Sequence, residues 1–366
     1  ALLSTLWSDQ SVVALKRWIK DVGNLLMVLV ILTEPNPSAA ARAGGYRGAA
    51  LLLPLSAAFI KFVPELGRTY HTWSGEMMFT GVTTHKNSLG ALAMICFLFL
   101  LWDYFCRREV KSQAGAGLLS LGVLIALAVW LLVLSRSATA LLCAIIGACL
   151  YIALRSRSVR AGIRGWWIVI VALGCAAWLL DASLGFSRFI IVDVLGRDPT
   201  LTTRTEVWPI LANYVQNPFL GTGFNSFWTG DRLAKLYGEL GIIQAHNGYL
   251  ETYLNLGVMG LFLLALLLLS GVRRINAGLL SDDDLSALQL TLLVVALVHN
   301  VSEASFDKMS PVWLALLLAV ARYPKKARQE NDNRSALPTR RRLQALRLAE
   351  RRRGPPPRAH RPRLHD

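Results

Sequence analysis

The sequence predicts an all-α fold: a polytopic bundle of transmembrane helices, with about nine spans visible and one large loop outside the membrane. Of the 366 residues, 54% are hydrophobic, and the mean hydropathy is +0.43. The apolar residues form long blocks and lack the ten-residue alternation of a membrane barrel. Because only helices or closed barrels satisfy backbone polar groups in lipid, these blocks predict membrane-spanning helices.

A helix needs roughly 17 to 25 residues to cross a bilayer, and the predicted spans contain 14 to 27 residues. The blocks lie at about 18–33, 48–64, 88–105, 117–134, 138–154, 165–181, 246–272, 287–303 and 309–322. They divide the chain into a first transmembrane block of about six spans, a large polar loop, a second block of about three spans, and a tail. These four parts are 1–181, 182–245, 246–322 and 323–366.

Arginine and lysine residues gather on alternate connections, and this bias predicts which face is cytoplasmic. These residues are Arg42 and Arg47; Arg107, Arg108 and Lys111; Arg155, Arg157, Arg160 and Arg164; and Arg273 and Arg274. The connections 65–87, 135–137, 182–245 and 304–308 are then external. Lys16, Arg17 and Lys20 break the pattern, and a preceding amphipathic interfacial helix would explain them. Since the chain begins at Ala1 without a charged and then apolar leader, we expect no signal peptide and a start part-way through a longer protein.

The end of the chain is strongly basic. The net charge of the chain is +16, and about +11 of it falls from Arg322 onward, where fifteen Lys and Arg face four acidic residues. We expect a disordered cytoplasmic tail that faces anionic lipids. Nucleic-acid binding is the rival interpretation of such a run, and attachment to a membrane bundle disfavours it. None of the five cysteines lies in the large loop, so no disulfide framework is implied.

His246 is the leading candidate for a functional residue. It opens the run His246-Asn247-Gly-Tyr-Leu-Glu-Thr-Tyr-Leu-Asn-Leu-Gly257-Val-Met-Gly260, directly ahead of an apolar block. An ionisable side chain where a polar loop meets the membrane costs insertion energy, and histidine can exchange protons near neutral pH. The sequence therefore predicts a functional site here.

Two external arginines have a local context that suggests anion binding. Arg136 lies in the short hairpin Ser135-Arg136-Ser137 between two spans. Thr203 and Glu206 have capping-box spacing, so Arg204 should be the first residue of a helix whose free N–H groups also face an anion. Alternatively, Arg136 reaches lipid headgroups and Arg204 is merely solvated.

Two further pairs are weaker candidates. His85 and Lys86 mark the external mouth of the third span, and the alternative is a polar helix start capped by Asn87 or Ser88. His299 and Glu303 are one turn apart near the external end of the eighth span and share a face. A structural hydrogen-bonded pair is the alternative there.

Together these residues suit one type of chemistry. Two external arginines suit a diphosphate, and a nearby imidazole suits proton removal from a hydroxyl. No metal-ligand spacing, serine nucleophile elbow or phosphate-cradling glycine loop occurs outside, so we expect neither a metal nor a cofactor. Glycosyl transfer from a lipid diphosphate fits, because fixed arginines could stabilise the departing charge in place of a metal ion.

Three stretches resemble the O-antigen ligase and polymerase family of bacterial inner membranes. His246-Asn247, nine residues, Gly257, two residues and Gly260 match the family's ligase motif. Gly81-Val-Thr-Thr-His85-Lys86-Asn87-Ser-Leu-Gly90 looks like an element of exopolysaccharide-type members. Arg204 to Trp208, followed by Asn217-Pro-Phe-Leu-Gly221-Thr-Gly223, resembles the family's large periplasmic loop.

The resemblance implies a metal-independent, inverting membrane glycosyltransferase of about twelve spans, facing the periplasm, with undecaprenyl diphosphate as the glycan carrier. By position, His246 would be the general base and Arg136 and Arg204 would bind the diphosphate. His85, Lys86, Asn247, His299 and Glu303 would lie at the substrate mouth or support the site. The acceptor would be lipid A-core for a ligase or a second lipid-linked glycan for a polymerase.

Two other classes of protein compete with an enzyme. A transporter or flippase of anionic lipids or solutes would show broken spans, charges near the midplane and repeated halves. A non-catalytic scaffold for envelope assembly would need no external set of histidine and arginines. The ionisable groups here crowd at the outer rim and no internal repeat is visible, which favours an enzyme.

Overall fold

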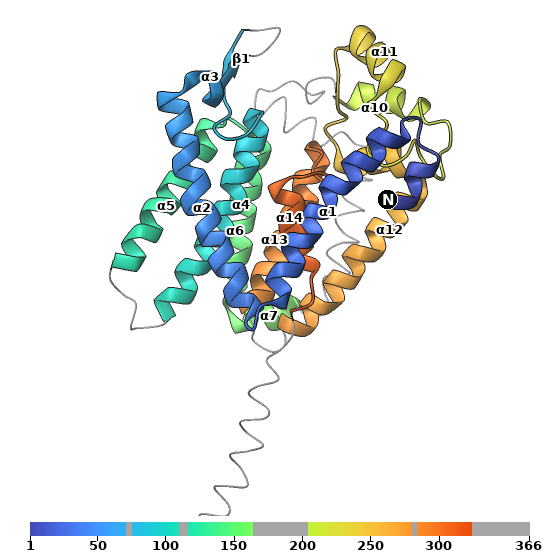
Figure 1. Cartoon of the computed structure of the whole chain (residues 1–366). Helices are drawn as coiled ribbons and strands as arrows, with labels where there is room; N and C mark the ends of the chain where they lie inside the picture. The colour runs from blue at the N-terminus through green and yellow to red at the C-terminus, as the bar shows by residue number, and fades with distance from the viewer. Residues whose placement is uncertain (71–74, 110–115, 164–203, 280–283, 324–366) are drawn as a thin grey trace, which may run out of the picture. The chain divides into compact units, whose positions relative to one another are not determined.

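The computed structural model describes residues 1–70, 75–109, 116–163, 204–279 and 284–323 (Figure 1). The predicted span 165–181, the first part of the predicted loop and the basic tail lie outside these residues. Within the described ranges, the fold is almost entirely helical. Its two short strands, β1 (Arg68–Tyr70) and β2 (Met77–Phe79), form an antiparallel pair in the connection ahead of α4.

Most predicted spans appear as helices near the predicted places. They are α1 (Ser11–Thr33), α2 (Pro37–Phe62), α4 (Lys86–Glu109), α5 (Ala116–Leu134), α6 (Ala138–Ala153), α12 (Gly248–Leu279), α13 (Asp284–Ser302) and α14 (Pro311–Val320). Five of them, α2, α4, α5, α12 and α13, are long and apolar enough to cross a membrane. Shorter elements are η1 (Leu2–Leu6), α3 (Pro64–Gly67), α7 (Arg157–Ile163), α10 (Arg204–Asn213) and α11 (Gly230–Leu240).

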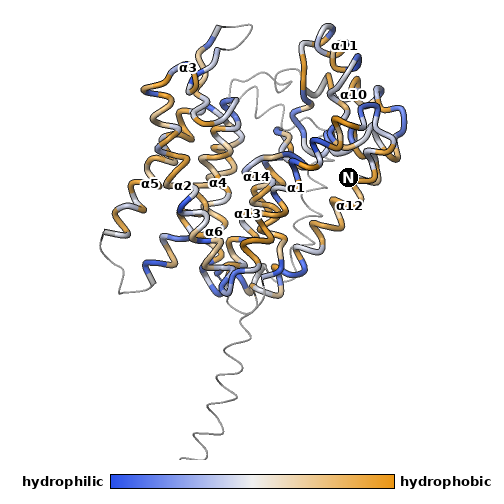
Figure 2. Tube along the Cα trace, in the orientation of Figure 1, coloured by the Kyte–Doolittle hydropathy of each residue, from blue (hydrophilic) through white to orange (hydrophobic). Residues whose placement is uncertain are grey.

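The helices form a bundle in which α4 and α13 are central. About 72% of the apolar window of α4 and 67% of that of α13 is buried, against 22–28% for α2, α5 and α12. Helix α4 packs against α2, α5, α6 and α14, and α13 against α6, α12 and α14. Large apolar side chains such as Val123 and Phe262 are exposed on the outer helices, and apolar residues dominate the spans in Figure 2. Exposed apolar faces of this extent suit contact with lipid.

Helix α2 is longer than the predicted 48–64. It begins at Pro37, where the fixed φ of proline suits a first helical residue. The Asn36 side chain caps it by accepting the N–H of Ala39 at 3.3 Å. Gly45 allows the close approach of α4, because a Cβ there would lie 2.6 Å from the Phe99 ring.

Ion pairs tie the helices together at the end predicted to be cytoplasmic. Asp103 of α4 is buried and pairs with Arg107 at 2.7 Å and with Arg42 of α2 at 3.6 Å. Arg160 is also buried and pairs with Asp284, the first residue of α13, at 2.8 Å. A buried charge is tolerated only when paired, so three of the basic residues used to predict orientation also have a structural role.

Helix α1 differs from the predicted span 18–33, because it begins at Ser11 and carries Lys16, Arg17 and Lys20 within one continuous helix. The expected separate amphipathic helix is therefore replaced by an extension of α1. Arg17 donates to the backbone carbonyl of Asn225, and the hydroxyls of Ser8 and Ser226 are 2.6 Å apart. The start of α1 thus packs against the segment between α10 and α11.

Candidate functional site

The segment 204–256 forms a small folded unit, which we call the external unit after its predicted location. Helices α10 and α11 pack with the first turns of α12 around a common apolar core. Its buried members are Leu211, Val215, Phe227, Leu236, Ala245 and Leu254. The predicted polar loop is therefore structured over its described part, in which α10 spans Arg204–Asn213. The predicted cap at Thr203 lies outside the described residues.

Helix α12 is broken at Gly257, whose φ of 63° and ψ of −161° are not helical. A residue with a side chain is strained at this φ, and a Cβ would lie 2.4 Å from the Phe219 backbone. The predicted span 246–272 is therefore wrong as one continuous helix. Residues 248–256 form a separate stub in the external unit, and 258–279 continue as the apolar part.

A turn at 217–223 inserts into this break and satisfies the backbone groups that it frees. The N–H groups of Val258 and Met259 donate to the carbonyls of Pro218 and Phe219 at 2.9 and 3.1 Å. In the other direction, Gly223 N–H donates to the Asn255 carbonyl at 2.8 Å. Two stretches that carry the family resemblance thus dock against each other, and Gly257 is needed because backbone meets backbone there.

A buried carboxylate holds the segment that presents His246. Glu251, 3% exposed, accepts the N–H of Ala245 at 2.9 Å and the indole N–H of Trp228 at 2.9 and 3.0 Å. Lys308 Nζ lies 3.8 Å from the same carboxylate. The Trp208 indole donates to the Ala245 carbonyl at 2.9 Å, so both backbone groups of the residue before His246 are held.

His246 has a left-handed backbone conformation, with a φ of 52°, and a partly exposed imidazole. The Gln244 amide nitrogen lies 3.0 Å from its Nε2 and 3.4 Å from its Nδ1. Asn247 has a structural role next to it, because its Oδ1 caps the stub by accepting the N–H groups of Tyr249 and Leu250 at 3.0 Å each.

Glu303 connects His246 to the helical bundle. It lies just beyond α13 and is 8% exposed. One carboxylate oxygen is 3.4 Å from His246 Nδ1, and the other accepts the Asn87 amide of α4 at 2.7 Å. Residues predicted separately at three places in the sequence are thus brought together: His246, Glu303 and the neighbourhood of His85 and Lys86.

The start of α4 differs in detail from the predicted cap. His85 caps the helix, because its Nδ1 accepts the N–H of Asn87 at 3.2 Å. The Asn87 side chain does not cap the helix but donates to the Glu303 carboxylate. Lys86 is half-buried beside them. His299 is 2% exposed, and its Nδ1 lies 3.3 Å from the Ser305 hydroxyl. The Glu303 N–H donates to the His299 carbonyl at 3.0 Å, and the carboxylate acts electrostatically on the His299 imidazole. The side-chain hydrogen bonds described for these two residues lead to different partners, despite their shared face.

Of the two arginines predicted to bind a diphosphate, the structure describes the side chain of Arg136 but not that of Arg204. Arg136, with a φ of 49°, lies in the hairpin between α5 and α6, and its guanidinium is 68% exposed and pairs with Glu76 at 2.7 Å. This hairpin lies against α4, since a Cβ at Gly90 would lie 2.8 Å from the Ser135 hydroxyl. Arg204 is the first described residue of α10, but its side chain lies outside the described part of the structure. No contact of His246 with Arg136 occurs among the described residues.

Asp307 is a polar feature that the sequence did not single out. It lies in the connection between α13 and α14 with a φ of 52°, and its carbonyl accepts the Asn225 amide at 2.8 Å. Burial raises the pKa of its carboxyl to about 6, with a further contribution from Asp21 and opposition from Lys308. Gln244, Glu251 and Trp228 were also missed, because ordinary loop and helix residues carry no sequence signal of their partners.

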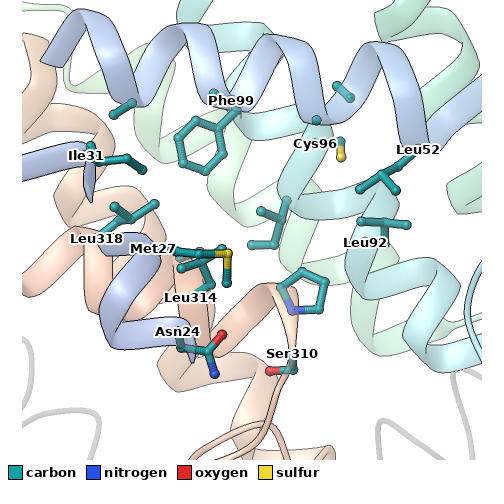
Figure 3. Close-up of a pocket in the computed structure, with 18 of the residues that line it drawn as sticks. Asn24, Met27, Ile31, Leu52, Leu92, Cys96, Phe99, Ser310, Leu314 and Leu318 are labelled. Atoms are coloured by element: carbon teal, nitrogen blue, oxygen red, sulfur yellow. The ribbon is translucent and has the colours of Figure 1, made fainter. Parts of the chain in front are cut away.

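An apolar pocket of about 660 Å³ lies between α1, α2, α4 and α14 (Figure 3). Met27, Leu52, Phe99 and Leu318 are among its lining side chains. Among the predicted site residues whose side chains the structure describes, none lines it. The polar cluster around His246 and the apolar pocket are thus different features of the molecule.

The long apolar helices and their exposed apolar faces define a class: a multi-pass α-helical membrane protein. Within that class, a profile of the family described as O-antigen ligase matches residues 121–265, which contain Arg136, Arg204 and His246. The chain is also 28% identical, over 303 residues, to the exopolysaccharide production protein ExoQ of Rhizobium meliloti (strain 1021). That alignment covers 77% of this chain and 65% of the relative, so the chain spans about two thirds of the relative's length. Both matches support placement in the O-antigen ligase and polymerase family.

Proposed function

We propose that this chain belongs to a membrane glycosyltransferase that moves a glycan from undecaprenyl diphosphate to an acceptor hydroxyl at the periplasmic face of the bacterial inner membrane. The observation that carries the proposal is the setting of His246. Its imidazole is partly exposed, while Glu251, Trp208 and Trp228 fix the backbone before it. A fixed, accessible imidazole suits proton transfer, and the match to the O-antigen ligase family covers it.

In the proposed reaction, His246 takes the proton of the acceptor hydroxyl. The acceptor oxygen forms a bond to the anomeric carbon with inversion, while the bond from that carbon to the phosphate oxygen breaks. The electron pair leaves on undecaprenyl diphosphate. Arg136 and Arg204 stabilise the resulting negative charge, so that no metal ion is required.

The arginine roles rest on chemistry and on the location of each residue. The Arg136–Glu76 pair is exposed, and such pairs contribute at most about 1 kcal/mol. A diphosphate can therefore take the place of Glu76 at little cost. Arg204 is the first described residue of α10, and the capping-box spacing predicts that the helix begins there, where free backbone N–H groups also favour an anion.

His246→Ala tests the central assignment. The full-length protein is reconstituted in vesicles with lipid-linked glycan, which is extracted from a strain that lacks this protein. The assay is run with and without lipid A-core, and no energy source is added. We expect product to fall by at least about a hundredfold while the donor still binds, because the general base contributes about 10²- to 10⁴-fold. Ile243→Ala, at a 61% exposed position nearby, should keep normal activity. Near-normal product from His246→Ala would remove the base assignment.

The same assay distinguishes the two possible acceptors. The family is described as O-antigen ligase, and the curated relative is named for exopolysaccharide production. A polymerase lengthens lipid-linked chains without lipid A-core, whereas a ligase forms product only when lipid A-core is present. A transporter would form no product under either condition.

A further inference from the structure

The carboxylate of Glu303 is the meeting point of three separate parts of the chain. It follows α13, contacts the His246 imidazole ahead of α12, and accepts a hydrogen bond from Asn87 in the first turn of α4. The relevant distances are 3.4 Å from Oε2 to His246 Nδ1 and 2.7 Å from Asn87 Nδ2 to Oε1. Neither contact is local to a helix, so the packing of the bundle decides where the carboxylate lies.

Burial explains why this carboxylate needs donors. Glu303 is 8% exposed, and a buried carboxylate costs free energy unless hydrogen bonds replace its hydration. Asn87 supplies one donor to Oε1. The imidazole can donate to Oε2 only when its Nδ1 carries a hydrogen, so the position of Glu303 favours that tautomer of a neutral ring.

We infer that Glu303 is a positioning residue that holds His246 with the hydrogen on Nδ1 and leaves the lone pair of Nε2 as the base. The inference rests on the proposed role of His246. Once Nε2 has taken the acceptor proton, the positively charged ring lies beside the Glu303 carboxylate, which stabilises it. Glu303 touches neither donor nor acceptor in this scheme and acts through His246 alone.

Gln244 lies next to the nitrogen that would act as the base. Its amide nitrogen lies 3.0 Å from His246 Nε2 and 3.4 Å from Nδ1, so it lies beside the ring and not in line with the Nε2 lone pair. That lone pair points away from Nδ1, the atom that contacts Glu303. An acceptor hydroxyl can therefore approach Nε2 along the lone pair without displacing Gln244.

Asn87 orients the carboxylate through its second oxygen. The Nδ1 of His85 accepts the Asn87 N–H and so fixes the first turn of α4, from which the amide reaches Glu303. Asn87 therefore acts on His246 indirectly, by orienting Glu303. Its loss should weaken the orientation of Glu303 without removing the negative charge.

Glu303→Gln is the decisive variant, because it preserves shape and the hydrogen bond from Asn87 while it removes the charge. In the vesicle assay, we expect kcat to fall at least about tenfold, as expected when a tautomer-setting carboxylate beside a catalytic histidine is lost. The KM for the lipid-linked glycan should stay within about twofold. Asn87→Ala should give a smaller fall in kcat. Glu239→Gln, a charge loss on the exposed face of α11, should change neither constant.

A double-variant cycle with His246→Ala separates positioning from a purely structural role. If Glu303 acts through His246, Glu303→Gln causes no further loss in protein that already lacks the imidazole. An equal fold-loss in both backgrounds, a change confined to KM, or an unchanged kcat overturns the inference. If Glu303→Gln does not fold, as judged by thermal unfolding in detergent, the same cycle is run with Asn87→Ala in place of Glu303→Gln, and the same outcomes support or overturn the inference. Failure of the proposed function instead appears as normal activity of His246→Ala itself.

Discussion

The backbone of His246 illustrates how much at the residue scale depends on distant contacts. The sequence identifies the imidazole from its place ahead of an apolar block, and Asn247 from the motif. Its φ of 52° and its contact with Glu303, 57 positions along the chain, cannot be read from that pattern. Glu303 itself was predictable as a candidate, but its partner was expected to be His299. The packing of α13 against the external unit determines the partner of Glu303, and the local spacing of residues along the helix does not predict it.

Asp307 gives a pH-dependent prediction for stability. The pKa of its carboxyl is about 6 in the folded protein, against an ordinary value of 3.8. The folded state therefore holds this proton more tightly than the unfolded chain does. Ionisation of Asp307 then opposes folding: the penalty is absent below about pH 4, grows up to about pH 6, and is complete above it.

We expect Asp307→Asn to raise the thermal unfolding midpoint at neutral pH, by an amount that corresponds to about 1–3 kcal/mol. Asparagine also tolerates the left-handed backbone at this position. The gain should shrink below pH 6 and vanish near pH 4, as measured by differential scanning fluorimetry in detergent. Glu65→Gln, at an exposed position, is the control for loss of a negative charge. A gain that does not vary with pH would refute the electrostatic explanation.

At the scale of elements, long apolar blocks placed most helices well, because burial in lipid leaves the backbone few alternatives. The ends were less predictable. Asn36 and Pro37 offer a cap and a first residue for α2, yet an apolar window alone starts this helix eleven residues later, at 48. The break in α12 was missed for another reason: Gly257 lies in a helix-forming context, and the inserted turn 217–223 that stabilises the break is distant in sequence.

Gly257→Ala should disrupt the external unit. The new Cβ would lie 2.4 Å from Phe219 backbone atoms, and alanine is also strained at a φ of 63°. We expect a loss of about 1–3 kcal/mol from the backbone conformation alone, together with loss of glycan transfer. Limited proteolysis of the external unit should report the change as faster cleavage. Gly122→Ala is the matched control, because nothing lies within 4 Å of its Cβ. Equal resistance of both variants to protease would show that the break tolerates a side chain.

For the whole molecule, composition alone predicted an all-α membrane protein, and the structure confirms that class. The number of spans stays a prediction beyond the five helices that meet the length and hydropathy required to cross a membrane. The proposed convergence of Arg136 and Arg204 on one donor also stays a prediction. The sequence could identify cations on one predicted face, but the distance between two connections depends on the packing of every helix that separates them.

Donor binding tests this convergence directly. Arg136→Glu and Arg204→Glu should each weaken the binding of undecaprenyl diphosphate by at least about tenfold, since hydrogen bonds between charged groups contribute about 1.5–3 kcal/mol. Microscale thermophoresis of full-length protein in detergent measures the affinity. Arg274→Glu, at the far end of α12, is the control for charge reversal and should leave the affinity unchanged. The described side-chain hydrogen bonds of Arg274 lead only to Ser270. Unchanged affinity in either of the first two variants would remove that arginine from the donor site.

The clamp around Gly257 also links the site to membrane thickness. Residues 258–279 number 22, enough to cross a bilayer with some tilt, and such a segment adapts to thinner or thicker lipid by changing its angle. The turn 217–223 binds Val258 and Met259 on the lipid side of the glycine and Leu254 and Asn255 on the other side. The stub that follows His246 is therefore tied to the segment in lipid, and a change in the tilt of that segment acts on the height and orientation of the imidazole.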